Sequence, residues 1–177
     1  MNAAYPIGDV KPLTWHLGMQ VTDGPGVIEL SLSTYIQEVI ERFGLTEAYT
    51  SRCCVPMDSA KFKQNPLSKK DMPKTAEEKL DPERCPYRAL LGCLSYISLW
   101  GRPDICTAIS ILARFQDNPG KRHWEALKHV AVYLKRNPDY CIRYQQDAPK
   151  HNALTGYADA DFANSDPDEM RSRTGYV

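Results

Sequence analysis

Residues 87–136 read YRALLGCLSYISLWGRPDICTAISILARFQDNPGKRHWEALKHVAVYLKR, and this stretch decides which fold we expect. Prolines at positions 86, 103 and 119 each stand at the beginning of a segment with regularly spaced apolar residues. Proline is tolerated in a first helical turn because the amide that it lacks would be unpaired there anyway. The sequence therefore predicts three consecutive helices, over residues 87–99, 103–116 and 119–136, with Asn118 as the cap of the third.

Apolar residues recur in all three segments at the spacing of three and four that is typical of half-buried helices. They are Leu90, Leu91, Leu94 and Ile97 in the first segment, Ile105, Ala108, Ile109 and Leu112 in the second, and Trp124, Leu127, Val130, Ala131 and Leu134 in the third. The five in the third segment fall within about 120° of one another around the helix axis. Each predicted helix therefore has one face to bury.

The third segment also carries a row of lysines, Lys121, Lys128 and Lys135, which are spaced seven residues apart and so lie on one side of a helix. From Arg84 to Arg136 the chain has nine Lys and Arg residues against three acids, although its total formal charge is zero. Such an excess of positive charge is where a polyanion would bind. The alternative is a solvated helix face whose lysines only keep the protein soluble.

Before this helical stretch, residues 14–32 have a period of two, which is typical of strands. The alternating apolar residues are Trp15, Leu17, Met19 and Val21, followed by Ile28, Leu30 and Leu32. The sequence Asp-Gly-Pro-Gly at 23–26 predicts a turn between the two runs, and hence a β-hairpin. Gly18 lies inside the first run, where a glycine indicates either a bulge or a close approach of another group to the backbone.

The remaining segments are a short helix, a linker and further strands. Thr34 and Gln37 have the spacing of a capping box, which predicts a helix that ends at Gly44. Residues 58–82 are rich in lysine and proline, which indicates a solvated linker. Strands are expected at 140–145, at 154–162 and from 174 onward. The chain thus divides into residues 1–57, 58–82, 83–138 and 139–177, and the fold class is α+β.

Composition restricts the classes of function. The six cysteines form no C-x-x-C pair and the four histidines have no H-E-x-x-H spacing, so we expect free thiols and no structural zinc. No apolar run approaches the roughly 20 residues needed to cross a bilayer, and the N-terminus does not have the order of a signal peptide. These features predict an intracellular protein, cytoplasmic or nuclear, without a membrane partner.

The tail holds the one candidate for chemistry. Residues 153–170 contain five acids and no Lys or Arg. Asp159 and Asp161 are two residues apart, so on a strand they share a face, where a cation such as Mg²⁺ would relieve their repulsion. A two-metal site needs about four carboxylates, of which one strand supplies at most two. Exposed aspartates at a strand end are the alternative interpretation.

Six motifs in one order resemble copia-type LTR retrotransposon polyproteins. They are YRALLGCLSY at 87–96, RPDI at 102–105, HWEALK at 123–128, YLK at 133–135, GYADADFA at 156–163 and RSRTGY at 171–176. Leu17-Gly18 and Val55-Pro56-Met57 look like the part of the same polyprotein that follows its reverse transcriptase active site. The resemblance begins at about Lys11 and covers nearly the whole chain.

This resemblance implies an assignment for each segment. Residues 1–57 would be the end of the reverse transcriptase palm, with Trp15, Leu17 and Gly18 in the primer grip. Residues 58–82 would be a polar linker and residues 83–138 the helical thumb and connection. Residues 139–177 would begin an RNase H-like sheet whose first catalytic carboxylate is Asp159. Phe162 stands where the family usually has tryptophan.

The resemblance also implies a function. A thumb follows a primer-template duplex, either an RNA·DNA hybrid or DNA, through the phosphate backbone, which assigns this role to Lys121, Arg122, Lys128, Lys135 and Arg136. The sequence contains no Tyr-x-Asp-Asp motif, and further RNase H carboxylates would follow Val177. We therefore expect a fragment with both active sites incomplete and no cofactor of its own, whereas the parent enzyme uses Mg²⁺. The remainder of the polyprotein is another expected partner.

Three other interpretations stay open at this point. The first is a free-standing helical module whose Trp124 face meets a protein partner. The second is a metal-dependent RNase H-like nuclease, built on Asp159 and Asp161 and completed by another chain. The third is a decayed reading frame whose product has no activity.

Overall fold

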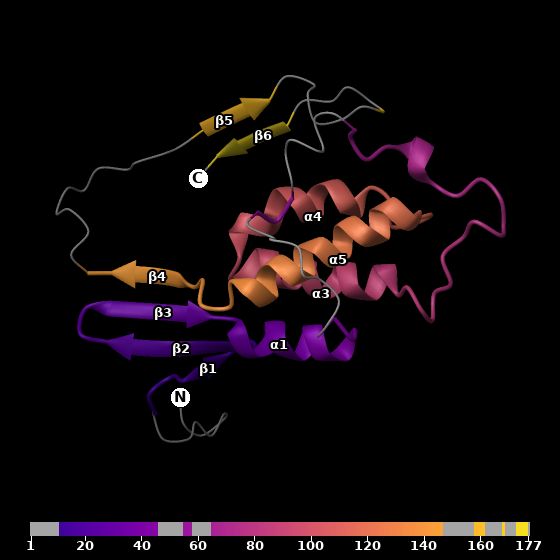
Figure 1. Cartoon of the computed structure of the whole chain (residues 1–177). Helices are drawn as coiled ribbons and strands as arrows, with labels where there is room; N and C mark the ends of the chain where they lie inside the picture. Colours follow the sequence, from indigo (N-terminus) through magenta and orange to yellow (C-terminus); the bar gives the residue numbers. More distant parts are fainter. Residues whose placement is uncertain are drawn as a thin grey trace, which may run out of the picture.

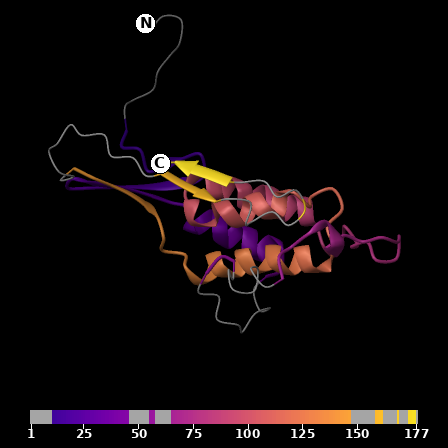
Figure 2. The ribbon, with the colours of Figure 1, turned by 90° about the horizontal axis from the view of Figure 1, so that it is seen from above.

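A computed structural model describes residues 11–45, 55–57, 65–146, 158–161, 168 and 173–176, and it has the mixed α+β architecture that the sequence predicts. The elements in chain order are β1 (Trp15–His16), β2 (Met19–Gly24), β3 (Val27–Ser31), α1 (Ser33–Arg42), the 3₁₀ helix η1 (Lys69–Asp71), α3 (Tyr87–Trp100), the 3₁₀ helix η2 (Pro103–Ile105), α4 (Cys106–Ala113), α5 (Lys121–Arg136), β4 (Ile142–Gln145), β5 (Ala158–Asp161) and β6 (Arg173–Tyr176). The α-helices pack into one bundle, and the sheet of β1 to β4 extends from one end of it (Figure 1). Figure 2 shows this sheet edge-on beside the helices.

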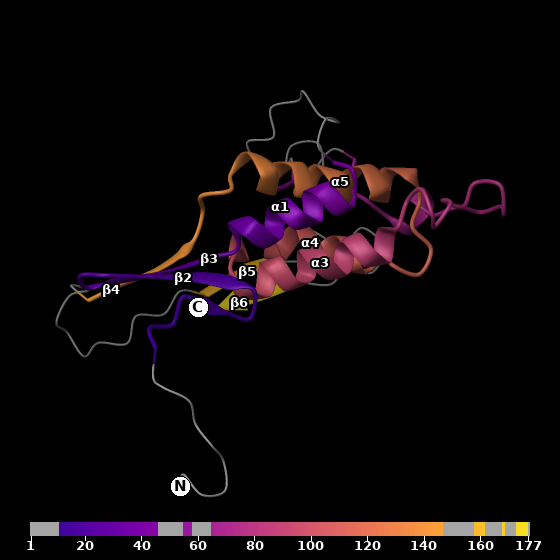
Figure 3. The ribbon, with the colours of Figure 1, turned by 90° about the horizontal axis from the view of Figure 1, so that it is seen from below.

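The predicted apolar faces of the three central helices form the core. Leu90, Leu94 and Ile97 of α3 are fully buried, and Leu127 and Leu134 of α5 are buried against them. Helix α1 lies beside α5 and α3 and covers part of the same core (Figure 3). The periodicity therefore predicted correctly which side of each helix packs. The segment 103–116 differs in length, because it starts as η2 and continues as α4 only to Ala113.

Two predicted helix caps are wrong. Helix α5 begins at Lys121 with Gly120 as the N-cap, and Asn118 instead donates from Nδ2 to the carbonyl oxygen of Pro73 at 3.1 Å. The Gly120 N–H donates to Nδ1 of His123 at 2.9 Å, so a side chain inside the first turn satisfies an amide that the cap would otherwise leave unpaired.

The capping box expected at Thr34 and Gln37 is also absent. Helix α1 begins at Ser33 after Leu32, which makes no side-chain cap bond, and Gln37 donates to Glu41 instead. Gly44 does end this helix as predicted, with a φ of 62° that a residue with a side chain rarely adopts.

The predicted hairpin is a three-stranded meander. Leu17 and Gly18 both have positive φ, 48° and 73°, and form a tight turn that pairs β1 with β2, with Trp15 opposite Gln20. Two-residue hairpin turns require this backbone conformation, which glycine adopts readily and leucine rarely does. Gly18 therefore marks a turn, and the expected bulge within one long strand is wrong.

Strand β4 adds to this meander as a fourth strand. It pairs antiparallel with β3, with Ile142 opposite Leu30 and Tyr144 opposite Ile28, and Arg143 forms an ion pair with Glu29 across the two strands. Residues 142–145 thus share a sheet with the first segment, although the predicted boundary places them with residues 139–177. Strands β5 and β6 pair antiparallel in a separate two-stranded sheet. The four segment boundaries themselves stay a prediction.

The middle of the expected linker, around η1, is packed against α5. The Ser68 hydroxyl accepts the N–H of Lys70, and the Asp71 carboxylate accepts the N–H of Ser68, so η1 is closed by a capping box of its own. Leu67 is 3% exposed. The backbone of Asp71 lies so close to Gly120 that a Cβ on Gly120 would stand 1.9 Å from the Asp71 carbonyl oxygen.

Gly120→Ala should therefore push η1 away from α5. We expect the free energy of unfolding to fall by about 1–3 kcal/mol, the range for overpacking that forces a backbone to shift. Urea denaturation of the full chain, followed by circular dichroism, measures it.

Gly92→Ala is the matched control, because Gly92 lies inside α3 with no other atom within 4 Å of the added Cβ. Helix propensity should make that variant more stable by up to about 1 kcal/mol. Equal stability of the two variants would show that η1 is not held against Gly120.

Candidate nucleic-acid interface

In the lysine row predicted on α5, the two end residues are exposed and the middle residue forms an ion pair. Lys121 and Lys135 are exposed. The Lys128 side chain is only 18% exposed, and its Nζ lies 2.9 Å from a carboxylate oxygen of Glu125 and 5.6 Å from the centre of the Trp124 ring. One helical turn thus supplies both of these contacts of Lys128, and the row is exposed at its two ends.

Arg122 is held by a segment between α1 and α3. Its Nη1 lies 2.5 Å from a carboxylate oxygen of Asp71, and its Nη2 donates to the carbonyl oxygen of Asn65 at 2.9 Å. Burial opposes ionisation of Asp71, but the hydrogen bonds from Arg122 and from the Ser68 amide outweigh it and lower the pKa of the carboxyl group. We call residues 65–72 the strap.

The remaining cation of the predicted set, Arg136, is exposed beside Lys135 at the last turn of α5. The excess of positive charge counted along residues 84–136 is therefore not all available on the surface. Asp71, which pairs with Arg122, comes from outside the counted stretch. The structure places Lys121, Lys135 and Arg136 in exposed positions, and it pairs Arg122 and Lys128 with carboxylates.

A buried ion pair that the sequence analysis treated only as a family motif fixes the far end of α5. Arg102 is 1% exposed, and its Nε and Nη2 donate to the two carboxylate oxygens of Asp104 at 2.9 and 2.8 Å. Its Nη1 donates to the carbonyl oxygen of Asn137 at 2.6 Å, and the Tyr133 hydroxyl donates to Asp104 at 2.8 Å. The motif Arg-Pro-Asp was the signal for this network, because two opposite charges flank a helix-starting proline.

The network shifts the ionisation of its members. Burial opposes ionisation of Asp104, yet the hydrogen bonds from Arg102 and Tyr133 lower the pKa of its carboxyl group. Burial, followed by the bond to Asp104, raises the pKa of the Tyr133 hydroxyl. Asp104 therefore stays ionised at neutral pH, and its pair with Arg102 holds the end of α5 that carries Lys135 and Arg136.

The predicted primer-grip residues lie in the sheet, in β1 and the turn that follows it. Trp15 and Leu17 are 52% and 55% exposed. The Tyr96 hydroxyl of α3 donates to the carbonyl oxygen of Leu17, and it lies 3.7 Å from where a Cβ on Gly18 would stand. The turn is thus anchored on the α3 side, whereas the lysine row is on α5 (Figure 3). The structure does not bring the two predicted groups together.

Asp159 and Asp161 occupy β5, opposite Gly175 and Arg173 of β6. Their side chains lie outside the described part of the structure. Within the described residues, no group of three His, Cys, Asp or Glu side chains converges as a metal site would require.

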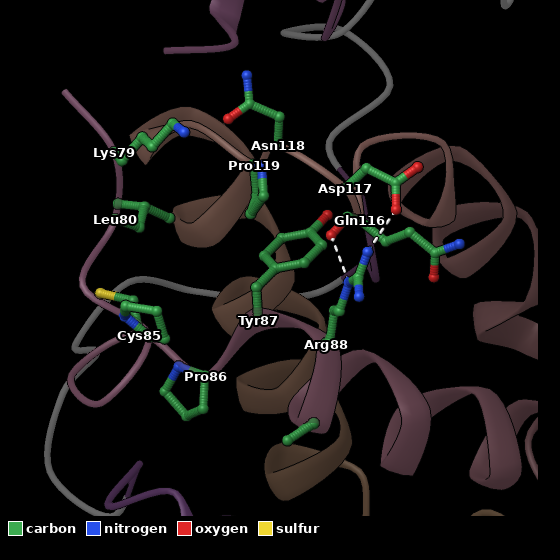
Figure 4. A pocket seen from close by; sticks show the side chains of 12 residues that line it. Lys79, Leu80, Cys85, Pro86, Tyr87, Arg88, Gln116, Asp117, Asn118 and Pro119 are labelled. Atoms are coloured by element: carbon green, nitrogen blue, oxygen red, sulfur yellow. Dashed lines mark hydrogen bonds and ion pairs between the residues drawn. The ribbon is translucent and has the colours of Figure 1, made fainter. Parts of the chain in front are cut away.

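A pocket of about 430 Å³ that the sequence did not indicate lies between the start of α3 and the loop before α5 (Figure 4). Arg88 closes one side, with Nε donating to the Gln116 carbonyl oxygen at 3.0 Å and an ion pair to Asp117. The Tyr87 hydroxyl donates to the Leu112 carbonyl oxygen, and burial raises the pKa of this group. The polar atoms of Arg88 and Tyr87 are thus engaged in bonds within the protein.

Comparisons with known proteins agree with the resemblance seen in the sequence. The chain is 35% identical over 179 residues to the retrovirus-related Pol polyprotein from transposon TNT 1-94 of Nicotiana tabacum. It is 28% identical over 180 residues to the retrovirus-related Pol polyprotein from transposon RE2 of Arabidopsis thaliana. Both alignments cover 100% of this chain, but only 13% and 11% of the relatives. The secreted RxLR effector protein 161 of Plasmopara viticola is 35% identical over 92 residues, 52% of this chain and 63% of that protein.

No family model and no solved structure matches the chain. Its homologues are retrovirus-related Pol polyproteins of plant transposons, which supports a copia-type retrotransposon polyprotein. In the parts of the chain that the structure describes, every helix is too short or too polar to cross a membrane.

Asp104→Asn should destabilise the protein strongly, because it removes the charge that compensates the buried Arg102 guanidinium. We expect a loss of about 3 kcal/mol in the free energy of unfolding at pH 7, typical of a broken buried pair. Urea denaturation measures it. The control is Asp117→Asn, whose partner Arg88 is exposed, and which should change stability by less than about 0.5 kcal/mol.

The same pair predicts a pH dependence. Because folding lowers the pKa of Asp104, the stabilisation is complete above the unfolded value, about 3.9, and is lost as the pH falls through the folded value. Stability of the wild type should therefore drop below about pH 4, and Asp104→Asn should lack part of this drop. Parallel acid-unfolding curves for the two proteins would contradict the stabilising role of the ionised Asp104.

Proposed function

We propose that this chain is a segment of a copia-type reverse transcriptase and RNase H polyprotein, and that it binds a primer-template duplex through the phosphate backbone. Alignment of the whole of this chain with a part of the Pol polyproteins of plant transposons supports the origin. The observation that carries the binding is the exposure of Lys121 and of Lys135 with Arg136 at opposite ends of α5.

The spacing of these cations suits a duplex. Lys121 and Lys135 are fourteen positions apart, which is about 21 Å along a helix. A duplex rises about 3.4 Å per base pair, so α5 would span about six base pairs. Contacts of this kind read no bases, and binding to an RNA·DNA hybrid or to DNA should be tolerant of sequence.

The finer assignments are part of this proposal. In it α3, α4 and α5 are the thumb and connection, and β5 with β6 begins the RNase H-like sheet that carries Asp159. The exposed turn of Trp15, Leu17 and Gly18 is the primer grip, which would contact the end of the primer from the α3 side. The chain then supplies binding surface and no complete active site.

Replacing Lys121 and Lys135 by Gln should weaken binding of a fluorescein-labelled RNA·DNA hybrid. We expect the slope of log Kd against log salt concentration to decrease by about 2, because two phosphate contacts are lost. Fluorescence anisotropy titrations at 50 and 200 mM KCl measure both the affinity and the slope.

The control for charge is Lys74→Gln with Lys79→Gln, which removes the same two charges from the loop before α3 and should leave the slope unchanged. If both double variants lose the same amount of affinity and salt slope, binding depends only on the net charge of the protein. Lack of salt-dependent binding in the wild type would refute the proposal.

A second candidate is a protein-interaction module, and exposed apolar residues at the end of α3 favour it. Leu99 is 75% exposed and Trp100 is 40% exposed, although both belong to a helix whose other face is core. Such a module would bind its partner through this apolar surface and have no affinity for duplex. The same titration therefore distinguishes the two functions.

A further inference from the structure

The contact between the strap and Arg122 has the geometry of a phosphate contact. The guanidinium offers N–H groups from both terminal nitrogens, and two oxygens accept them, from the Asp71 carboxylate at 2.5 Å and the Asn65 carbonyl at 2.9 Å. A phosphate group presents two oxygens to arginine in the same way, with the same negative charge. The strap thus occupies the one arginine that lies next to Lys121 on the first turn of α5.

The strap is fastened at several points on the same end of the bundle. Its Asp71 carbonyl abuts Gly120, and just after it the Pro73 carbonyl accepts the Asn118 side-chain amide. The Lys69 N–H donates to a carboxylate oxygen of Asp168 at 2.8 Å. These contacts place the strap over the first turn of α5, where a duplex lying along the lysine row would arrive.

The fastening is nevertheless light compared with the core. The regular structure of the strap is a 3₁₀ helix of three residues, and Leu67 is its one fully buried apolar side chain. The side chain of Arg122 is 42% exposed and that of Asp71 is 13% exposed, so solvent and salt reach the ion pair from the Arg122 side. Segments with few buried apolar contacts open locally without unfolding the whole domain.

We propose that the strap is an autoinhibitory element, in which Asp71 and the Asn65 carbonyl stand in for a nucleic-acid phosphate on Arg122. A duplex then binds in two stages. It first contacts Lys121 and Lys135, and Arg122 takes a phosphate only when the strap leaves. This inference rests on the proposed function and adds to it a competition within the chain for one phosphate site.

The test is the effect of Asp71→Asn on hybrid binding by the full chain. Removing the competing carboxylate should tighten binding about fivefold, the factor expected for one partly exposed ion pair. The salt slope should steepen by about 0.9, because one more phosphate is neutralised. Adding Arg122→Gln to Asp71→Asn should abolish both gains.

Glu29→Gln is the matched control, since Glu29 is also a carboxylate paired with an arginine, Arg143, but lies on the sheet. It changes net charge by the same amount and should leave affinity within about twofold, since exposed ion pairs contribute little. If Glu29→Gln tightens binding as much as Asp71→Asn does, the effect is one of net charge and the inference is overturned.

A measurement on the wild type avoids any folding defect of the variants. Hydrogen–deuterium exchange at the amides of Lys70, Asp71 and Met72 should accelerate when hybrid is added at saturation, because the strap is displaced. Unchanged protection at saturation would overturn the inference while leaving the proposed function intact. Absence of any hybrid binding, in the wild type and in Asp71→Asn, would overturn both.

Discussion

The buried guanidinium of Arg102 is the constraint on which the arrangement of the helices depends. A charge that is 1% exposed is costly unless it is paired and fully hydrogen-bonded. The partners are Asp104, the Asn137 carbonyl and the rings of Tyr133 and Tyr140. They come from η2, from the end of α5 and from the loop that follows it. Helix η2 and the end of α5 must therefore meet at this point, which fixes the position of the C-terminal end of α5 in the bundle.

The other end of α5 is fixed by packing and by a neutral histidine. His123 is fully buried and stacks on Phe115 with ring centres 4.0 Å apart. Burial lowers the pKa of His123, so that Nδ1 stays available to accept the Gly120 N–H. Because Gly120 also admits the backbone of Asp71, this end of α5 and the strap are held by one small contact area. The exposed cations thus stand on a helix whose two ends are both fixed.

Local patterns predicted the helices of this fold well, and contacts between distant residues could not be predicted. The three-and-four periodicity of α3 to α5 depends only on neighbouring residues, so their buried faces were read correctly from the sequence. The pairing of β3 with β4, and of Tyr96 with the Leu17 turn, joins residues more than seventy positions apart. No local pattern encodes such pairs.

The candidate site shows the same division between local and distant information. The exposure of Lys121 and Lys135 follows from the helical period, and the pair of Lys128 with Glu125, three residues apart, was open to prediction from spacing alone. The ion pair of Arg122 could not be predicted in this way, because its partner Asp71 lies 51 positions earlier. Charge counted along the sequence therefore overstated the cationic surface of α5.

Arginine and lysine have different uses in this structure, and the difference explains where charge remains at the surface. Arg88, Arg102 and Arg122 each join two segments, since a guanidinium can bind a carboxylate and a backbone carbonyl at once. An ammonium group has no such fixed fork, and Lys121 and Lys135 stay exposed at the ends of α5. Arg102 and Arg122 fasten segments of the fold here, whereas Lys121, Lys135 and Arg136 are the exposed cations of α5. Arg122 has both roles. It joins the strap to α5, and it lies next to the exposed Lys121 on the first turn of α5.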